Sequence, residues 1–107
     1  MLQEQQINQI RVVLKKINPK LAVILRALGD KCRCSIFILI IKHKDLCVTD
    51  IAKICGITVS AASQHLRILE RLGLVVSIKM GKEVCYQVNK KDFFVKQLIN
   101  FIKKSIN

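Results

Sequence analysis

The sequence predicts a mostly α-helical fold with one small β-hairpin, and three observations support this prediction. Apolar residues recur every three or four positions over most of the chain, as they do on one face of a helix. The period changes to two only between residues 74 and 88, which is typical of strands. The chain has 107 residues, 51% of them hydrophobic, which is enough for one core. We therefore expect a single domain over residues 1–107.

Composition narrows the choice of partner and location. The chain carries 19 Lys and Arg against 7 Asp and Glu, and its net charge of +12 favours a polyanion such as nucleic acid. A generically basic protein would show the same charge, so the placement of the basic residues has to decide. The N-terminus is polar, and the longest apolar run, Ile36–Ile41, is too short to span a membrane. We expect a cytoplasmic protein with no membrane partner, in which the five cysteines do not form a disulfide scaffold.

The first part of the chain predicts three helices. Asn18 and Pro19 favour the start of the second helix, and Gly29 ends it. Asp30 can cap a third helix that runs to about His43, and this helix is apolar on nearly every side, so we expect it at the centre. The first helix carries a narrow apolar seam suited to packing against another helix: Ile7, Ile10, Leu14 and Ile17.

Two further helical patterns, Thr49–Cys55 and Thr58–Leu72, are separated only by Gly56 and Ile57, where glycine allows a tight turn. Residues 74–88 then alternate, and Met80-Gly81 between lysines predicts a hairpin tip. The stripe from Phe94 to Ile106 is too wide for one small domain to cover. The order of elements predicts a winged helix-turn-helix with a two-stranded β-hairpin wing, whose terminal helices form a dimer interface.

The segment from Val48 to Val75 resembles the ArsR/SmtB family of winged helix-turn-helix repressors. The features that match are Ala52 in the first helix, Gly56 in the turn, Ser-Gln-His-Leu at 63–66 and Leu-Gly-Leu-Val at 72–75. Upstream, Leu-Gly-Asp at 28–30 and Arg33 resemble that family's signature, although Lys-Cys at 31–32 replaces its Pro-Thr. The resemblance covers roughly residues 20 to 90. It implies a transcriptional regulator, a repressor that binds double-stranded DNA at a palindromic operator as a homodimer through its terminal helices.

The second helix of the motif has two distinct faces when residues are placed about 100° apart. Val59, Ala62, Leu66 and Leu69 share one side, and a polar set lies opposite, with Ser63 at the margin and Thr58 as the cap. Small hydroxyl residues allow close approach to the major groove, Gln can pair with adenine, and Arg can pair with guanine or phosphate. An ordinary solvated face is the alternative. The helix residues predicted to contact DNA are Thr58, Val59, Ser60, Ser63, Gln64, Arg67 and Arg71.

Basic residues flank the hairpin tip as well. Lys79 and Lys82 lie on either side of Met80-Gly81, so we predict that they contact DNA phosphates, although a basic turn can also serve solubility. His65 lies nearer the apolar side of its helix, so we expect a structural hydrogen bond from it rather than a base contact.

Members of the resembled family usually release DNA when a ligand binds, and one common site uses Cys-Val-Cys. Here Cys47-Val48-Thr49 keeps only the first thiol, and the C-terminal helix offers Asp92 without a histidine, so neither familiar metal site is complete and no cofactor is identified. We expect release, if any, by a metal, a metalloid or thiol oxidation. Cys32, near a helix start and basic neighbours, and Cys47 are the candidate sensors. The other cysteines divide into core candidates, Cys34 and Cys55, and an exposed one, Cys85.

Two other classes of function are alternatives to a sequence-specific regulator. A non-specific nucleic-acid-binding or chromatin-like architectural module would share the charge but not the sequence discrimination. An enzyme is not expected, because the chain has two histidines, of which only His43 is free of a structural role, and it has no phosphate-binding glycine loop and no paired carboxylates in a recognisable arrangement.

Overall fold

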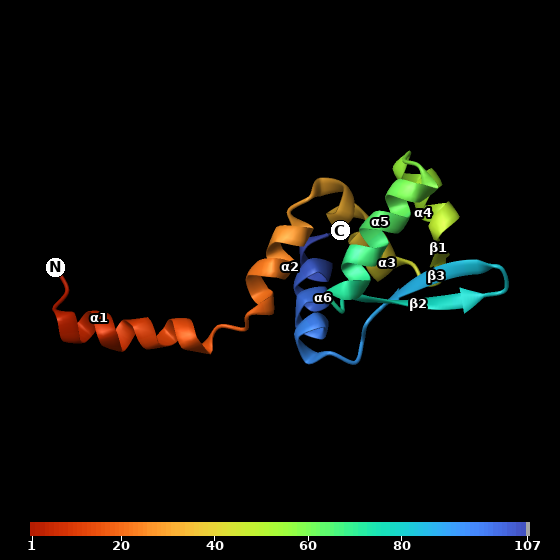
Figure 1. The fold of residues 1–107 in the computed structure, drawn as a ribbon. Coiled ribbons are helices and arrows are strands. Elements are labelled where there is room, and N and C mark those ends of the chain that lie inside the picture. The colour runs from red at the N-terminus through yellow and green to blue at the C-terminus, as the bar shows by residue number, and fades with distance from the viewer. Residues whose placement is uncertain (107) are drawn as a thin grey trace.

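The predicted mostly α architecture with a hairpin wing is confirmed in the computed structural model, which describes residues 1–106 (Figure 1). No helix within this range is both long and apolar enough to cross a membrane. The elements are α1 (Glu4–Arg11), a 3₁₀ helix η1 (Val12–Lys16), α2 (Lys20–Leu28), α3 (Lys31–Lys42), β1 (Leu46–Cys47), α4 (Val48–Cys55), α5 (Val59–Arg71), β2 (Val75–Met80), β3 (Glu83–Val88) and α6 (Phe93–Ser105).

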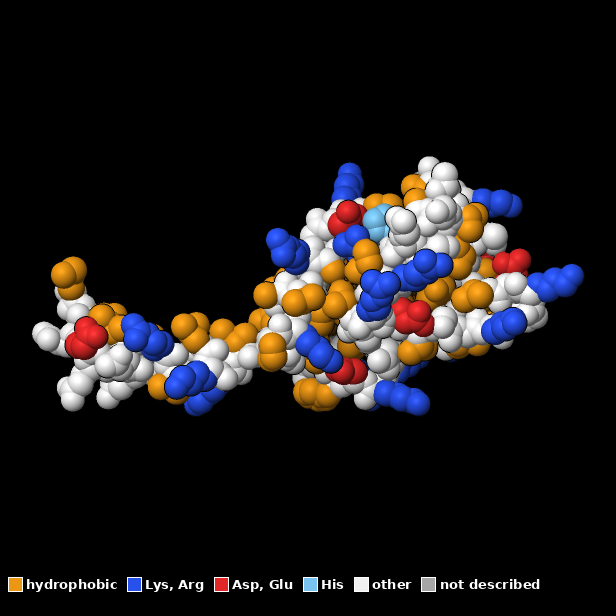
Figure 2. All heavy atoms as spheres, viewed as in Figure 1, with side chains coloured by type: hydrophobic (Ala, Val, Ile, Leu, Met, Phe, Trp, Pro, Cys, Tyr) orange, Lys and Arg blue, Asp and Glu red, His pale blue; other side chains and the backbone are white. Residues whose placement is uncertain are grey.

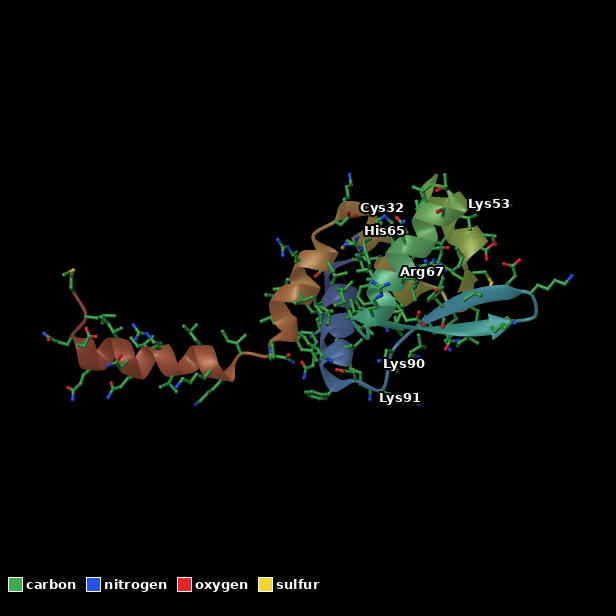
Figure 3. The ribbon with its side chains drawn as sticks, viewed as in Figure 1. Cys32, Lys53, His65, Arg67, Lys90 and Lys91 are labelled. Carbon is green, nitrogen blue, oxygen red and sulfur yellow. A yellow bond between two sulfur atoms is a disulfide. The ribbon has the colours of Figure 1, made fainter. Side chains whose placement is uncertain are left out.

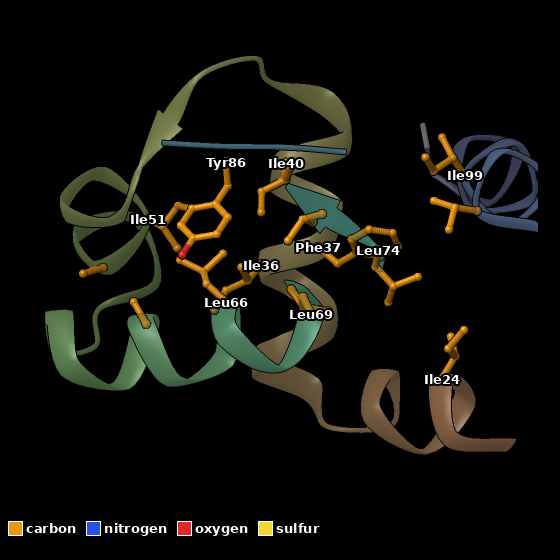
Figure 4. Packing of buried hydrophobic residues seen from close by; sticks show 14 residues of the cluster. Ile24, Ile36, Phe37, Ile40, Ile51, Leu66, Leu69, Leu74, Tyr86 and Ile99 are labelled. Atoms are coloured by element: carbon orange, nitrogen blue, oxygen red, sulfur yellow. The ribbon is translucent and has the colours of Figure 1, made fainter. Parts of the chain in front are cut away.

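Helix α3 lies at the centre of the core, as its apolar composition predicts. Ile36 and Phe37 are fully buried and pack with Leu66 and Leu69 of α5, while Tyr86 of β3 covers them from the sheet (Figure 4). Because burying a large aliphatic or aromatic side chain contributes about 1.5–3 kcal/mol, this cluster holds the helix-turn-helix and the sheet together. The surfaces of α4, α5 and the hairpin that face away from α3 remain free for contacts.

The sheet has three antiparallel strands in the order β1-β3-β2, one more than the sequence predicts. Strands β2 and β3 form the expected hairpin, but its two-residue turn is Gly81-Lys82 rather than the predicted Met80-Gly81, because Met80 is still paired with Glu83. Strand β1 contains only Leu46 and Cys47 and pairs with the other edge of β3. A strand of two residues is too short for an alternating pattern, which explains why the sequence gives no sign of it.

The predicted boundaries of the second and third helices are confirmed by their terminal hydrogen bonds. The Lys20 amide donates to the Asn18 side chain at 2.9 Å, and Gly29 lies at the C-terminal end of α2. The Asp30 carboxylate accepts from the Arg33 amide at 3.0 Å and caps α3. These bonds satisfy amide groups that a helix end leaves without partners.

The N-terminal segment projects away from the rest of the chain (Figure 1), and the molecule measures 61 × 28 × 26 Å. The expected single helix is divided into α1 and η1, and neither contains a buried residue. Its apolar seam is largely uncovered: Ile10, Leu14 and Ile17 are exposed, Leu14 to 65%. In α2, Ile24 and Ala27 are buried in the core, whereas Leu21 and Leu25 are exposed.

Candidate DNA-binding interface

The turn between α4 and α5 sets the angle between the two helices of the motif. Gly56 takes a left-handed conformation with φ of 67°, which costs a non-glycine residue about 1–2 kcal/mol. The Ile57 amide then donates to the Ala52 carbonyl at 3.0 Å, and the Thr58 hydroxyl accepts from the Ala61 amide at 3.0 Å. The turn closes one helix and caps the next within three residues, so the start of α5 has a fixed position.

The two predicted faces of α5 are separated as the helical period requires. Ala62, Leu66 and Leu69 are fully buried. Val59, placed on the apolar side by the same geometry, is instead 48% exposed, because it lies in the first turn, beyond the reach of the core. The residues predicted to contact DNA in this helix are exposed, with Ser63 half-buried at the margin: Thr58, Val59, Ser60, Gln64, Arg67 and Arg71.

One hydrogen bond joins the hairpin to α5, and two more close the base of the hairpin immediately after α5. The Glu70 carboxylate accepts from the Ser77 amide of β2 at 3.2 Å. The Asn89 amide side chain donates to the Gly73 carbonyl at 2.9 Å, and its backbone amide donates to the Leu74 carbonyl at 3.0 Å. These bonds join residues that are up to 16 positions apart, so no local sequence pattern reveals them. The hairpin and the outward face of α5 are therefore held as one unit.

Basic side chains gather on this unit. Lys79 and Lys82 are exposed near the hairpin tip, and Gly81 between them has a φ of 65°. Arg67 projects from the outward side of α5, and Lys53 lies at the far end of α4 (Figure 3). Figure 2 shows Lys and Arg side chains over α5 and along the hairpin on the same face. A polar helix with cations on both flanks has the charge and shape that suit a DNA groove bordered by phosphates.

The corner between α2 and α3 shows what the Leu-Gly-Asp and Arg33 signature does in this chain. The Arg33 guanidinium donates to the Ala27 carbonyl at 2.9 Å, while Asp30 caps α3. The bond that Asp30 accepts from the Arg33 amide lowers the pKa of its carboxyl group. The signature therefore fixes the corner between α2 and α3. His65 is half-buried as expected, but its Nδ1 is buried and has no hydrogen-bond partner within residues 1–106, so the predicted structural hydrogen bond is not present at this atom.

Two expectations for the cysteines are wrong. Cys85 is 1% exposed rather than open to solvent, and it forms a disulfide with Cys47, although no disulfide was expected. The physical reason is strand β1, which places the two residues opposite each other with their Cα atoms 3.9 Å apart. Cys32, Cys34 and Cys55 are free and half-buried, and burial raises the pKa of the Cys55 thiol.

The disulfide lies where the hairpin meets the helix-turn-helix. Cys47 precedes the first residue of α4, where its amide donates to the Asp50 carboxylate at 3.2 Å, and Cys85 belongs to β3 of the hairpin. The covalent bond thus connects the hairpin with the first helix of the helix-turn-helix. The sequence indicates Cys47 as a candidate sensor but not Cys85, because the two residues are 38 positions apart.

A capped helix-turn-helix whose second helix exposes a polar face beside a basic hairpin defines a winged helix-turn-helix DNA-binding protein. Residues 30–77 match the family model of bacterial regulatory proteins of the arsR family. A cadmium resistance transcriptional regulatory protein CadC homolog from Staphylococcus aureus is 36% identical over 92% of this chain and 80% of its own length. The chain belongs to the ArsR family and is a DNA-binding transcriptional regulator, as the resemblance to ArsR/SmtB repressors implies.

Solved structures support the same fold. HlyU from Vibrio cholerae has a TM-score of 0.70 and 29% identity, with coverage of 80% of this chain and 90% of its own. The homodimeric winged helix-turn-helix domain Mb0332 from Mycobacterium bovis has a TM-score of 0.68 at 23% identity, covering 89% of this chain and 82% of that one. The winged helix-turn-helix fold is thereby confirmed.

Proposed function

We propose that this chain is a repressor that binds a palindromic operator in double-stranded DNA as a homodimer and catalyses no reaction. Residues 1–107 act as one domain, in the cytoplasm, where the DNA partner lies. The observation that supports this function best is the exposed polar face of α5, held rigidly beside a basic hairpin. In a complex, α5 would enter the major groove and the hairpin would follow the adjacent backbone.

Each predicted contact then has a chemical role. Gln64 would donate to and accept from an adenine edge, and Arg67 would pair with guanine. Arg71, Lys79 and Lys82 would bind phosphates, which adds affinity without sequence preference. The N-terminal part of α5 and its cap would come closest to the bases or backbone: Thr58, Val59, Ser60 and Ser63.

The proposed dimer rests on uncovered apolar surface. In a single chain the seam of α1 and η1 is exposed, and Phe101 of α6 is 68% exposed, so a second copy that covers this surface would stabilise these helices further. The Mycobacterium bovis neighbour is described as a homodimer. A two-fold dimer would present two α5 helices to half-sites about 34 Å apart.

Fluorescence anisotropy on DNA from upstream of the protein's own gene tests operator binding. We expect the specific duplex to bind at least about 10³-fold more tightly than a shuffled duplex of equal length at moderate salt. Equal affinity for both duplexes would instead select the alternative, a non-specific or architectural nucleic-acid-binding module, and would contradict this proposal.

The side chains of this chain do not complete the Cys-Val-Cys type of soft-metal site. The relative from Staphylococcus aureus is named for cadmium resistance. Here Thr49 stands where a second thiolate would be needed, and Cys47 is already bonded to Cys85. Within residues 1–106 there is no group of three or more His, Cys, Asp or Glu side chains that could hold a metal ion. Cys32, the other candidate sensor, has no such group around it.

We infer that the signal is instead the oxidation state of Cys47 and Cys85. Cys47 is half-buried and Cys85 is buried, so a peroxide would meet Cys47 first. The Cys47 thiolate attacks one peroxide oxygen, giving a sulfenic acid and releasing water or an alcohol. The Cys85 sulfur then attacks the Cys47 sulfur, forming the S–S bond and releasing water. Two thiols are oxidised, and one peroxide is reduced by two electrons.

Operator anisotropy of the oxidised and the dithiothreitol-reduced protein tests this signal. We expect the two states to differ at least about fivefold in affinity, because the bond joins the hairpin to α4. In Cys47→Ser and Cys85→Ser the difference should vanish, and in the control Cys32→Ser it should persist. Equal affinity of the two states in the parent protein, or a difference that survives both substitutions, would contradict the proposal.

A further inference from the structure

A lysine-lined cleft lies between the end of α3, the base of the hairpin and α6, and the proposed function does not use it. Its volume is about 780 Å³. Several chain segments contribute to its walls, namely the end of α3, the loop after it, the turn after β3 and two turns of α6. Among the described residues that line it there is no Asp or Glu, and there are six lysines: Lys42, Lys44, Lys90, Lys91, Lys96 and Lys103.

Five of the six lysines of the cleft have no carboxylate partner within residues 1–106. The ammonium groups of Lys44, Lys90, Lys91, Lys96 and Lys103 make no ion pair with a carboxylate of residues 1–106. The two nearest carboxylates in sequence accept hydrogen bonds from other groups. Asp45 accepts from the Gln87 side chain at 2.6 Å, and Asp92 accepts from the Val95 amide at the start of α6. Like charges repel in this arrangement, and a bound anion would relieve the repulsion.

The size and floor of the cleft favour a small molecule. Its volume falls within the range of about 300–1,000 Å³ that is usual for small-ligand sites. Ile40 and Ile99, both buried, form part of the floor, and Val76 and Val88 line the side of the sheet. Cations at the rim and aliphatic carbons below suit a ligand that has a highly charged part and a less polar part.

The position of the cleft separates it from the surfaces already assigned. Lys103 lies about 160° around α6 from Phe101, so a partner subunit on the Phe101 side leaves the cleft open. In Figure 3, Lys90 and Lys91 lie beside α6 and the base of the hairpin, on the side of the molecule away from Lys53 and the start of α5. The cleft is therefore independent of the proposed operator contacts.

We propose that this cleft binds a small anion with two or more phosphate groups, such as a nucleoside polyphosphate. Lysine ammonium groups are compact cations that suit phosphate oxygens, and several of them together favour a multiply charged group over a single carboxylate. The aliphatic floor accommodates the uncharged part of the ligand.

Isothermal titration calorimetry of the full chain tests the site, with ATP and inorganic tripolyphosphate as probes and adenosine as the uncharged control. We expect both phosphates to bind with a micromolar Kd and adenosine not to bind. The variant Lys90→Gln/Lys91→Gln/Lys96→Gln should lose at least about tenfold in ATP affinity. The matched variant Lys15→Gln/Lys16→Gln/Lys20→Gln removes the same charge from the N-terminal segment and should keep the parent Kd. Equal losses in both variants, or no binding below millimolar ATP, would overturn the proposal.

A second measurement separates a small anion from the DNA backbone as the source of phosphate. We expect the cleft variant to keep the parent's operator affinity and salt dependence. If these lysines contacted DNA instead, the slope of log K against log salt would decrease in magnitude by about 0.9 for each lost contact. That outcome would assign the lysines to DNA and reject the small-anion site.

Discussion

At the scale of single residues, side chains of the same type have different roles, depending on their surroundings. Arg33 donates to a backbone carbonyl and fixes a helix corner, whereas Arg67 and Arg71 are exposed on α5. Cys55 is a half-buried free thiol whose pKa is raised by burial, whereas Cys47 is bonded to Cys85. Residue type alone therefore does not identify a contact. Exposure and the direction in which the side chain points decide it.

The Asp30 cap makes a testable contribution to stability that depends on pH. The hydrogen bond from the Arg33 amide lowers the Asp30 pKa below its ordinary value of 3.8, so the folded state favours the carboxylate. Its stabilising effect should be fully present above that ordinary value and should decline as the pH falls below it. Urea unfolding of the parent and of Asp30→Ala should show a stability difference at pH 7 that shrinks toward pH 3. A difference that is constant over this range would contradict the account.

Lys79 and Lys82 are predicted to contribute affinity without specificity. Replacing either with Gln should weaken binding to specific and shuffled duplexes by similar factors and should reduce the salt slope by about 1. Glu83→Gln, beside the same turn, is a control that should not weaken binding. Anisotropy titrations at several salt concentrations measure both quantities. A loss confined to the specific duplex would show that these lysines read sequence instead.

At the scale of elements, the glycine turn between α4 and α5 determines how the reading helix is held. Gly56→Ala should destabilise the fold by about 1 kcal/mol, because alanine is strained at a φ of 67°. Gly56→Asn should lose less stability than Gly56→Ala, because asparagine tolerates the left-handed region. No atom lies within 4 Å of the position that a Cβ at this residue would occupy, so crowding does not contribute. Equal destabilisation by both substitutions in thermal unfolding would contradict this explanation.

The elements also show how far sequence reasoning reaches. Helix α5 was predicted correctly because its period separates Ala62, Leu66 and Leu69 from the polar residues, and its cap and turn are local signals. Strand β1 and the Cys47–Cys85 pair were not predicted, because they depend on a contact between segments 38 positions apart. The bonds of Asn89 and Glu70 that orient the hairpin were missed for the same reason. Local periodicity predicts individual helices and strands, whereas the contacts between them are seen only in the folded structure.

At the scale of the whole molecule, the proposed dimer explains why the apolar seam of α1 and η1 is exposed in a single chain. Leu14→Asp places a charge on the exposed seam and should not disturb the core, because Leu14 is 65% exposed. Analytical ultracentrifugation should show a dimer for the parent and a monomer for the variant, while the control Lys15→Asp stays dimeric. A parent that remains monomeric at working concentrations would contradict the proposed assembly.

The central claim is that the polar face of α5 reads the operator sequence, and anisotropy of the double variant Gln64→Ala/Arg67→Ala tests it most directly. Each base contact contributes about 1–3 kcal/mol of discrimination, so the variant should bind the specific duplex about 30-fold or more weakly than the parent. Its affinity for a shuffled duplex should change far less, and its unfolding midpoint should be that of the parent. A variant that still prefers the specific duplex as strongly as the parent does would show that another surface reads the sequence.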